Sequence, residues 1–391
     1  MDATTGDGDP PGWRPARCDR VALVLQGGGA LGAYQAGVYQ ALHEAGIQPD
    51  WICGVSIGAV NAALIAGNPP ERRLDALRCF WDRVTTQDLL GPLAGLLQPP
   101  AELMGDDLRR LRNLGSATAA ALFGQNGFFR PNRLSPWLVP RGAPGATAWY
   151  TTEPLRETLL ELVDFDRIND RRLRFAVGAV NVLSGNFIYF DNAEAEITPE
   201  HVMASGALPP GLPMVRVGTD WFWDGGLVSN TPLQHVLEAE EVLNTLVFQV
   251  DLFSARGPLP RDMEDVLGRE KDIRYSSRTR YNTDMYQRIH GWKVKLKQAL
   301  EKVPEERLSD EERLLKEQLS DLPEVVVLQL IYQQKVYEGN ARDYEFSRAT
   351  MLEHWESGLA DTRRTLLRKE WLEMPQEDSG LVAHDVHRAE E

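Results

Sequence analysis

The sequence predicts a three-layer α/β/α fold with a mainly parallel central sheet, because its first segments alternate between strand and helix. An unbroken apolar run at 21–25 is typical of a buried parallel strand. Glycines follow it, and then helical spacing over 33–45 stops at Gly46, a common C-terminal cap. A second apolar run at 51–55 leads directly into a helix over 57–66. Strands that are connected through helices in this way lie parallel in one sheet.

The chain falls into four portions by composition. Residues 1–19 form a polar leader that we expect to be flexible, and residues 376–391 form an acidic, small-residue tail that we expect to be disordered. Residues 20–250 form the main α/β domain, with a proline-broken helical insertion at about 70–170. Residues 251–375 hold a charged helical arm (roughly 262–320), a final strand and a C-terminal extension. Further strands are predicted at 173–182, 186–190, 246–251 and 325–331.

Charge and cysteine content narrow the classes of partner. The formal charge of -15, from 42 basic and 57 acidic residues, argues against a nucleic-acid partner. The three cysteines, Cys18, Cys53 and Cys79, have neither the number for a disulfide framework nor the spacing of metal ligands, so we expect no metal and a reduced, cytoplasmic setting. No secretory signal begins the sequence, and no stretch reaches the ~18 to 20 apolar residues that span a bilayer. We therefore expect any lipid contact to be peripheral.

A candidate nucleophile lies in Gly54-Val55-Ser56-Ile57-Gly58, which has the G-x-S-x-G pattern. Its chemistry needs a hydroxyl on a sharp turn from strand to helix, and the flanking Gly54 and Gly58 permit the crowded backbone there. The context supports the motif, because an apolar strand ends before Ser56 and a helix rich in small residues follows it. The N-terminus of that helix also places a positive dipole end beneath the serine. The alternative is a structural turn that contains a serine by chance.

The glycine loop at 27–32 fits two functions. It can form an oxyanion hole, because successive N–H groups can point at one developing negative charge; the candidates are Gly27, Gly28, Gly29, Ala30 and Gly32. It also satisfies G-x-G-x-x-G between a strand and a helix, which is the context of an NAD-binding oxidoreductase. A dinucleotide site predicts an acidic residue at the end of the second strand, where this chain has Ser56. We therefore prefer the oxyanion loop.

Two residues compete as the base that would activate Ser56. His235 would complete a Ser–Asp–His order along the chain, but it lies in a helical stretch where an exposed surface histidine is the ordinary interpretation. Asp224 lies in a glycine-containing loop after three aromatic residues, 221–223, which could desolvate the carboxylate and raise its pKa. An Asp-Gly pair also commonly fixes a β-turn. Spacing and composition alone leave Asp224 and His235 open.

Taken together, these residues resemble the patatin-like phospholipase family. The loop at 27–32 is similar to the family's oxyanion motif, 54–58 to its nucleophile elbow, 204–210 to a third block, and Asp224-Gly225-Gly226 to its catalytic Asp-Gly-Gly/Ala motif. The resemblance implies a Ser56–Asp224 dyad without histidine, hydrolysis of lipid acyl esters through an acyl-enzyme, and no cofactor. It decides the base in favour of Asp224. One departure is Leu31, where many members carry Arg or Lys, so neutral glycerides and hydroxy-acid oligomers stay open as alternative ester substrates.

The region after residue 250 carries predictions about surfaces. Between Arg269 and Lys302 there are ten Lys or Arg and four Asp or Glu, with aromatic residues interleaved. A basic amphipathic helix with aromatics can lie on an anionic lipid surface, but a solvated helical hairpin or a subunit contact in a homo-oligomer is the alternative. Residues 342–350 and 353–358 are similar to a C-terminal extension of a bacterial subgroup of the family. The apolar stretch 89–103 is predicted to line the entrance to the site.

Overall fold

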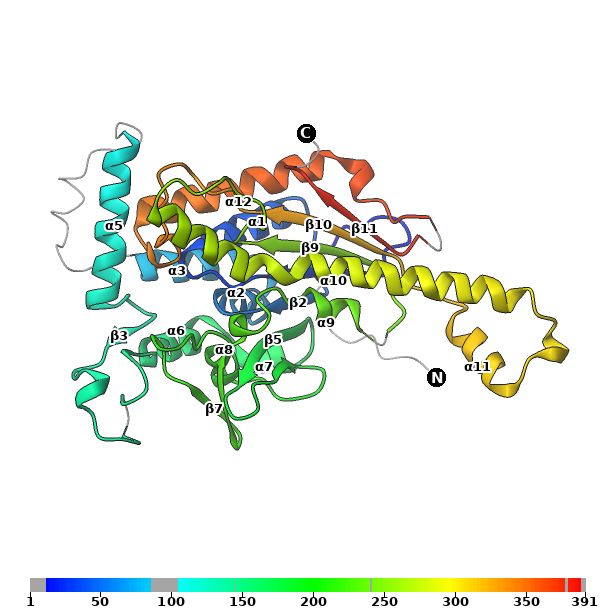
Figure 1. Ribbon diagram of the computed structural model, residues 1–391, viewed down its shortest axis with the longest axis horizontal. Coiled ribbons are helices and arrows are strands. Elements are labelled where there is room, and N and C mark those ends of the chain that lie inside the picture. The colour runs from blue at the N-terminus through cyan, green and yellow to red at the C-terminus, as the bar shows by residue number, and fades with distance from the viewer. Residues whose placement is uncertain (1–11, 86–104, 144, 240, 377–378, 388–391) are drawn as a thin grey trace.

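Nine strands of the described residues form one sheet at the centre of the molecule (Figure 1). The computed structural model describes residues 12–85, 105–143, 145–239, 241–376 and 379–387, without the side chains of 107 and 277–282. The sheet has the order β11-β10-β9-β1-β2-β5-β8-β7, and β6 pairs with β5 off this path. Its strands are β1 (Arg20–Leu25), β2 (Trp51–Gly54), β5 (Arg174–Asn181), β6 (Phe187–Asp191), β7 (Val215–Val217), β8 (Asp220–Asp224), β9 (Thr245–Asp251), β10 (Val325–Ile331) and β11 (Leu381–Asp385).

The central strands are parallel and buried on both faces, as their unbroken apolar runs predict. β1 pairs in parallel with β2 on one side and with β9 on the other, and β9 continues in parallel to β10 and β11. Along β1, Val21, Leu23 and Leu25 face one hydrophobic core, whereas Ala22 and Val24 face a second core. The sheet therefore needs a layer of helices on each side.

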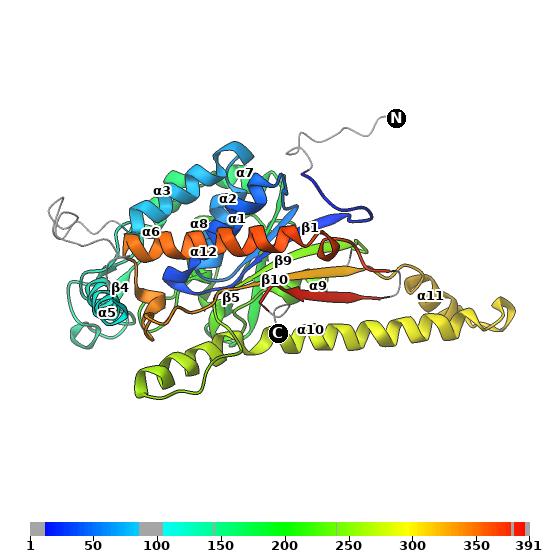
Figure 2. The same cartoon turned by 90° about the horizontal axis from the view of Figure 1, so that it is seen from above.

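Helices cover both faces of the sheet, so the predicted three-layer α/β/α class is confirmed (Figures 1 and 2). The helices α1, α2, α3 and α12 lie over one face, and α9 and α10 lie over the other (Figure 2). Their bounds are α1 (Ala33–Glu44), α2 (Ile57–Ala66), α3 (Arg73–Thr85), α5 (Asp106–Phe123), α6 (Glu153–Leu162), α7 (Phe165–Asn169), α8 (Pro199–Ser205), α9 (Leu233–Leu237), α10 (Met263–Glu301), α11 (Asp310–Gln318) and α12 (Arg348–Leu367).

The C-terminal helix α12 packs tightly along α1, so the residues after 250 join the same body as the residues before it. A Cβ at Gly37 of α1 would overlap the carbonyl oxygen of Trp355, and a Cβ at Gly358 of α12 would overlap that of Tyr34. Glycine at both positions lets the two helix backbones touch. The Trp355 indole also donates a hydrogen bond of 2.7 Å to Gln40 Oε1. The sheet itself joins the two portions, because β10 pairs with β9.

The expected disorder of residues 376–391 needs a correction. Within this tail, β11 pairs in parallel with β10 at the edge of the sheet, and Leu381 and Val386 are buried. The Gln287 amide of α10 donates to the Leu381 carbonyl at 2.9 Å. An acidic, small-residue composition predicts disorder only for a segment without a partner, and here the open edge of β10 supplies one.

The hairpin of β7 and β8 is a second departure from the prediction, which placed Asp224 in a loop. Asp224 is instead the last residue of β8, and a 3₁₀ turn (Gly225–Leu227) follows it. β7 has three residues and β8 has five, so neither carries enough alternation to be recognised by periodicity.

The tip of the arm, where α11 follows α10, and the α5 end of the insertion lie at opposite ends of the molecule's longest axis (Figures 1 and 2). The arm is a hairpin in which α11 folds back on α10 over a small cluster of Leu300, Leu308 and Leu319. The insertion includes α5 and a two-stranded ribbon of β3 (Arg130–Pro131) and β4 (Tyr150–Thr151). The stretch 89–103, predicted to line the entrance, lies outside the described residues. No helix among the described residues has the length and apolar character to cross a membrane.

Candidate active site

Ser56 lies on a strained turn between β2 and α2. Its backbone angles, φ 56° and ψ -124°, fall where side chains other than glycine are uncommon. The turn is tight, because a Cβ at Gly54 would overlap the Gly58 backbone and a Cβ at Gly58 would overlap the Leu25 carbonyl. The two glycines of the G-x-S-x-G pattern therefore allow β2, α2 and the end of β1 to converge, and the Ser56 side chain lines a cavity.

The register of β5 brings Asp224 to Ser56. β6 occupies one edge of β5, so β2 and β8 share the other edge. β2 runs parallel to β5 and ends at Gly54, opposite Val177, whereas β8 runs antiparallel and ends at Asp224, opposite Ala179. The two strands thus meet end to end, and the residues after one and at the end of the other face each other.

The Asp224 carboxylate accepts a hydrogen bond of 2.7 Å from the Gly226 N–H, and the Ser56 side chain lies close enough to interact with it. The side chain is buried, with 2% of the residue exposed. Burial raises the pKa of Asp224 to about 6, against the opposing effects of the Gly226 N–H and the Ser56 side chain. Asp224 is therefore a stronger base than an exposed aspartate, and it is still mostly ionised at neutral pH.

The aromatic residues before Asp224 do not desolvate it in the predicted way. Side chains alternate along β8, so Phe222 shares the buried face with Asp224, whereas Trp221 and Trp223 point to the other face. Trp221 is 39% exposed. The raised pKa of Asp224 follows from the burial of its carboxylate.

The glycine loop presents only part of its N–H groups to Ser56. The Gly27 N–H donates to the Asn230 carbonyl at 3.3 Å, and Gly32 lies against Ile57 and Trp81, away from the cavity lining. Ala30 is buried and likewise does not line the cavity. Among the described residues, no acceptor lies within hydrogen-bond distance of the N–H groups of Gly28, Gly29 and Ile57. All three residues line the same cavity as Ser56.

A cavity of about 590 Å³ opens above Ser56 and is mainly apolar. Aromatic side chains dominate its wall; they are Phe128, Phe129, Trp149, Tyr150, Phe253, Tyr275, Tyr344 and Phe346. The charged side chains among its described lining residues are both acidic, Asp224 and Asp343. The described residues hold no group of three or more His, Cys, Asp or Glu placed to bind a metal. The cavity is suited to an uncharged, chain-like group.

The C-terminal half of the chain forms one wall of this cavity. A Cβ at Gly29, which has φ +56°, would overlap the carbonyl oxygen of Asp343, so the loop around 343 rests directly on the glycine loop. Lys271 of α10 holds that loop by donating to Asp343 at 2.7 Å and to the Asn340 carbonyl at 2.8 Å. A buried ion pair between Arg342 and Asp272 adds a second attachment. The wall depends on α10 and on the extension together.

A family model described as patatin-like phospholipase matches residues 23–237, which is more than half of the chain. The chain belongs to the patatin-like phospholipase family. A second model, described as patatin phospholipase, matches residues 273–378. The first match contains Ser56 and Asp224, and the second contains the loop around Asp343 that forms the opposite wall of the cavity in this patatin-like protein.

Individual relatives match over short stretches. The chain is 62% identical over 50 residues to lysophospholipase nte1 of Aspergillus terreus, covering 12% of this chain and 3% of that protein. It is 46% identical over 60 residues to triacylglycerol lipase ptl3 of Schizosaccharomyces pombe, covering 15% of this chain and 12% of that protein. Among solved structures, VipD from Legionella pneumophila has a TM-score of 0.33 at 14% identity, covering 91% of this chain and 72% of that chain. The chain thus spans a small part of these two curated relatives.

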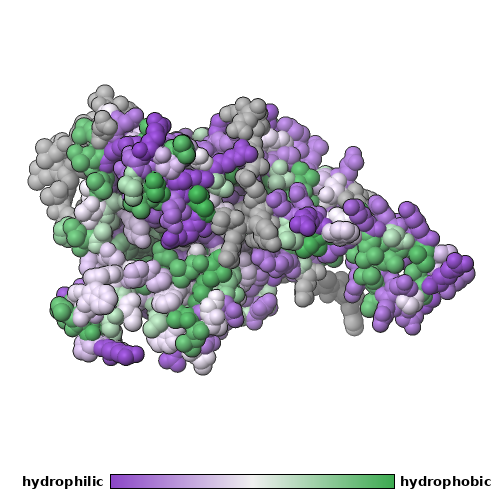
Figure 3. Space-filling model, viewed as in Figure 1, coloured by the Kyte–Doolittle hydropathy of each residue, from purple (hydrophilic) through white to green (hydrophobic). Residues whose placement is uncertain are grey.

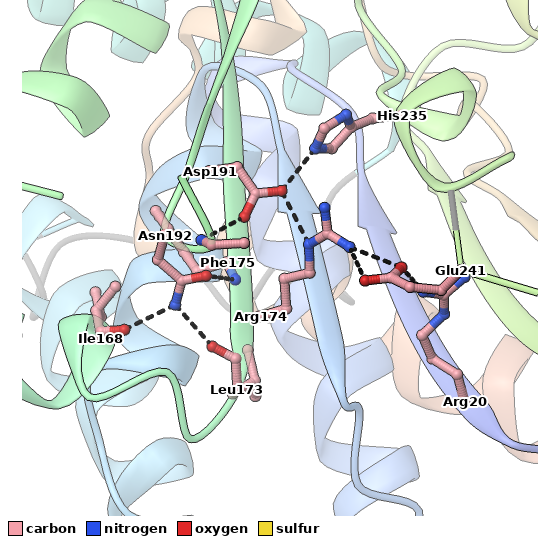
Figure 4. A network of polar contacts seen from close by, with 10 residues as sticks. Arg20, Ile168, Leu173, Arg174, Phe175, Asp191, Asn192, His235 and Glu241 are labelled. Atoms are coloured by element: carbon pink, nitrogen blue, oxygen red, sulfur yellow. Dashed lines mark hydrogen bonds and ion pairs between the residues drawn. The ribbon is translucent and has the colours of Figure 1, made fainter. Parts of the chain in front are cut away.

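Two alternatives from the sequence lose support in this patatin-like domain. A dinucleotide site needs an acidic residue at the end of the second strand, but β2 ends at Gly54 and is followed by Ser56. His235 is the other alternative, and it lies in a separate network (Figure 4). Its Nε2 donates to Asp191 at 2.8 Å, its ring stacks on Tyr189 with centroids 4.0 Å apart, and it does not line the cavity.

The network around His235 ties several strands together (Figure 4). Asp191 also accepts from Arg174 at 3.0 Å and from the Ala193 N–H at 2.8 Å. Arg174 lies over the Trp51 ring, 3.8 Å from its centroid, and pairs with Glu241. Burial tends to raise the pKa of Asp191, but the hydrogen bonds from His235 and Ala193 and the charge of Arg174 outweigh it and lower that pKa. The histidine is thus neither exposed nor beside Ser56.

Two residues without an assigned role in the sequence position the site. Asn230 Nδ2 donates to the Gly27 carbonyl at 3.0 Å and so joins the glycine loop to the turn after Asp224. Ser205 Oγ accepts from the Ser56 N–H at 3.1 Å and donates to the Gly178 carbonyl at 2.6 Å. Ser205 lies in the block at 204–210, and Asn230 follows the Asp-Gly-Gly motif closely. Their positioning role is visible only in their tertiary contacts.

Proposed function

We propose that this chain hydrolyses acyl ester bonds of lipid substrates through a Ser56–Asp224 dyad and a covalent acyl-enzyme. The observation that carries the proposal is that Ser56, on its strained turn, and the buried Asp224 carboxylate lie close enough to interact and line the same apolar cavity. A hydroxyl is a poor nucleophile without an adjacent base, and here the base and the room for an acyl chain coincide. The lipid-hydrolase names of the relatives support the same class of reaction.

In the first half-reaction, Ser56 Oγ attacks the carbonyl carbon of the ester while its proton passes to Asp224. The tetrahedral intermediate collapses with cleavage of the ester C–O bond, and Asp224 returns the proton to the departing alcohol oxygen. The pKa of about 6 suits both roles, because the group accepts and releases a proton near neutral pH. The acyl group remains on Ser56.

In the second half-reaction, water attacks the acyl carbonyl carbon while Asp224 accepts its proton. Collapse of the second tetrahedral intermediate breaks the bond to Ser56 Oγ, and the proton on Asp224 returns to that oxygen. The products are a carboxylic acid and the original enzyme. One carboxylate therefore serves as base and acid in turn, without a histidine.

The proposed oxyanion donors are the N–H groups of Gly28, Gly29 and Ile57. They have no acceptor among the described residues and lie on the two turns that flank Ser56. One such donor is typically worth about 3 to 4 kcal/mol in the transition state. Ile57 also begins α2, so the positive end of the helix dipole adds to the same effect.

The lining of the cavity bears on the substrate. A phosphate drawn deep into the cavity would meet the Asp224 carboxylate and no cation of the described lining, because the nearby Lys271 is already paired with Asp343. Leu31, which replaces the Arg or Lys of many members, is fully buried in the core and offers no charge either. The lining thus favours a neutral acyl ester near Ser56, with any phosphate outside. A neutral glyceride is the second candidate substrate, in line with the lipase name of one relative.

The test is a panel of phospholipids, neutral glycerides and short chromogenic esters, assayed with the wild type and with Ser56→Ala. We expect hydrolysis of at least one lipid class and a loss of about 10⁴-fold or more in the variant. A fluorophosphonate probe should label the wild type at Ser56 and leave the variant unlabelled. Hydrolysis by Ser56→Ala within threefold of the wild type would contradict the proposal.

A further inference from the structure

The insertion exposes large apolar side chains at the end of the molecule opposite the tip of the arm, where α11 follows α10. Trp137 and Leu138, in a 3₁₀ turn (Pro136–Leu138), are 86% and 74% exposed. On α5 and beside it, further apolar residues are exposed to a similar degree. We call the following set the apolar rim: Leu111, Leu122, Phe123, Trp137, Leu138 and Trp149. Green apolar patches lie over α5 at this end of the molecule in Figure 3.

The apolar side chains of helix α5 are distributed opposite to those of an ordinary surface helix. Its inner face buries Asn113, Ala117 and Ala120, whose spacing of four and three residues marks one side. Leu111 and Leu122 lie on the opposite side, where a surface helix normally carries polar residues. The larger apolar side chains therefore point outward, and the small ones point to the protein. Such an arrangement is typical of a helix with a second apolar partner.

The apolar rim is continuous with the cavity above Ser56. Leu122 and Trp149 line the cavity and are also 64% and 44% exposed, so they stand at its mouth. An acyl chain that leaves a lipid surface at this point would pass from the rim to Ser56 along apolar side chains. A protein partner bound over the same residues would close that path. The continuity favours a lipid surface as the partner.

The charge around the rim matches an anionic surface. Residues 105–150 contain six arginines and two aspartates, with no Lys or Glu, in a chain of net charge -15. Arg133 and Arg141 flank the exposed turn; both are exposed, and neither pairs with a described acidic residue. Cations beside exposed tryptophan and leucine are the pattern of a peripheral contact with anionic lipid.

We infer that the apolar rim docks the mouth of the cavity on an anionic lipid surface. Docking at this place rests on the exposed residues and their charge. The passage of an acyl chain to Ser56 rests in addition on the proposed function. The inference moves lipid contact from the basic arm, where the charge pattern predicts it, to the insertion.

The arm serves as a matched comparison. Its helix α10 also exposes a tryptophan and two aliphatic residues, Ile289, Trp292 and Leu296, near basic side chains. They lie toward the end of the longest axis that is away from α5, and the acidic helix α11 folds back beside them (Figures 1 and 2). The far part of α10 therefore offers side chains of the same kind at a place remote from the mouth.

Vesicle binding by full-length protein with Ser56→Ala separates docking from turnover. On phosphatidylcholine vesicles that contain about 30% phosphatidylserine, Leu111→Ser/Trp137→Ser/Leu138→Ser should weaken binding by about tenfold or more. Ile289→Ser/Trp292→Ser/Leu296→Ser should change it by less than about twofold. Arg133→Gln/Arg141→Gln should weaken binding to anionic vesicles only, by about threefold or more, and leave pure phosphatidylcholine binding unchanged.

The same substitutions in the active protein test folding and the site. None of the substituted rim residues lines the cavity, so hydrolysis of a soluble short-chain ester should be retained while hydrolysis of vesicle lipid falls. Equal vesicle binding by the rim variant and its parent would overturn the inference, and so would a loss confined to the arm variant. A parent protein that does not bind vesicles but self-associates in sedimentation experiments, and loses that self-association when the rim residues are substituted, would overturn the inference in favour of a protein interface. Vesicle binding without any ester hydrolysis would instead count against the proposed function alone.

Discussion

Two buried aspartates on strands beside β5, Asp224 and Asp191, differ in what surrounds them and therefore in what they can do. Both are almost fully buried, at 2% and 1% exposure. Asp224 pairs with Ala179 across β5, accepts a hydrogen bond from one N–H group, and has the neutral Ser56 side chain beside it. Asp191 pairs with Ala176 on the other edge, and its partners are a guanidinium, an imidazole and an N–H group. Burial raises the pKa of the first to about 6, whereas the pKa of the second is lowered.

The difference shows that burial alone does not make a carboxylate a base. Desolvation acts on both groups, but only Asp224 lacks a cation to offset it. A carboxylate with a cation stays ionised and holds structure together, and one without a cation retains affinity for a proton. The contrast also explains why a histidine near a carboxylate, as His235 is near Asp191, does not by itself mark a catalytic pair.

The largest expected effect is on turnover. Asp224→Asn should lower kcat/KM for a soluble ester by about 10³-fold or more, because an amide cannot accept the Ser56 proton. Asp191→Asn, the same change on the other side of β5, should leave kcat/KM within about threefold where the protein is folded. Steady-state kinetics gives kcat/KM for both variants. An equal loss of kcat/KM in the two folded variants would contradict the distinct roles of Asp224 and Asp191.

The pH dependence of the wild type should locate the same carboxylate. Because Asp224 must be ionised to act as a base, kcat/KM should fall about tenfold per pH unit below a pKa of about 6. The acid limb should be absent from the pH profile of the residual activity of Asp224→Asn. An acid limb centred near pH 4 in the wild type would mean that burial does not tune this group.

The two Asp→Asn substitutions should change stability in opposite directions. Asp191→Asn removes the charge that faces Arg174 and His235 and should destabilise by about 2 to 3 kcal/mol at neutral pH. Asp224→Asn should stabilise by about 2 to 3 kcal/mol above pH 6, because the raised pKa means that ionised Asp224 opposes folding there. That gain should fall below about 1 kcal/mol at pH 4 and vanish near pH 3, below the unfolded pKa of about 3.9, where the wild-type carboxyl is protonated in both the folded and the unfolded protein. Denaturant titrations at pH 8 and pH 4 test the sign, and destabilisation by both variants at pH 8 would contradict it.

The smallest effect should come from His235. His235→Ala should keep most esterase activity and cost about 1 to 2 kcal/mol of stability, through the lost hydrogen bond to Asp191 and the lost stacking on Tyr189. His235→Gln, which retains a donor, is the control and should recover part of the stability. A folded His235→Ala protein without activity would restore the Ser–Asp–His order as the active arrangement.

The local features of this site are determined by the sequence alone. The run 21–25, the glycines after it and the G-x-S-x-G at 54–58 each lie within a few residues of one another, so strand, loop, elbow and helix follow from short-range sterics and periodicity. The same local patterns predict the parallel sheet and the boundaries of α2. Composition, in contrast, misassigned the tail, because β11 exists only through its pairing with β10.

Apart from the family resemblance, only the tertiary structure decided which of the two candidate bases lies near Ser56. Asp224 and His235 are about equally far along the chain from Ser56, and no local pattern separates them. The choice depends on the register in which β2 and β8 share one edge of β5, and on the partners that draw His235 to Asp191. The same holds for the glycine loop, where Asn230 occupies one N–H group and Asp343 covers another glycine. These are contacts between distant segments, and their geometry is set by packing of the whole sheet, which local periodicity does not encode.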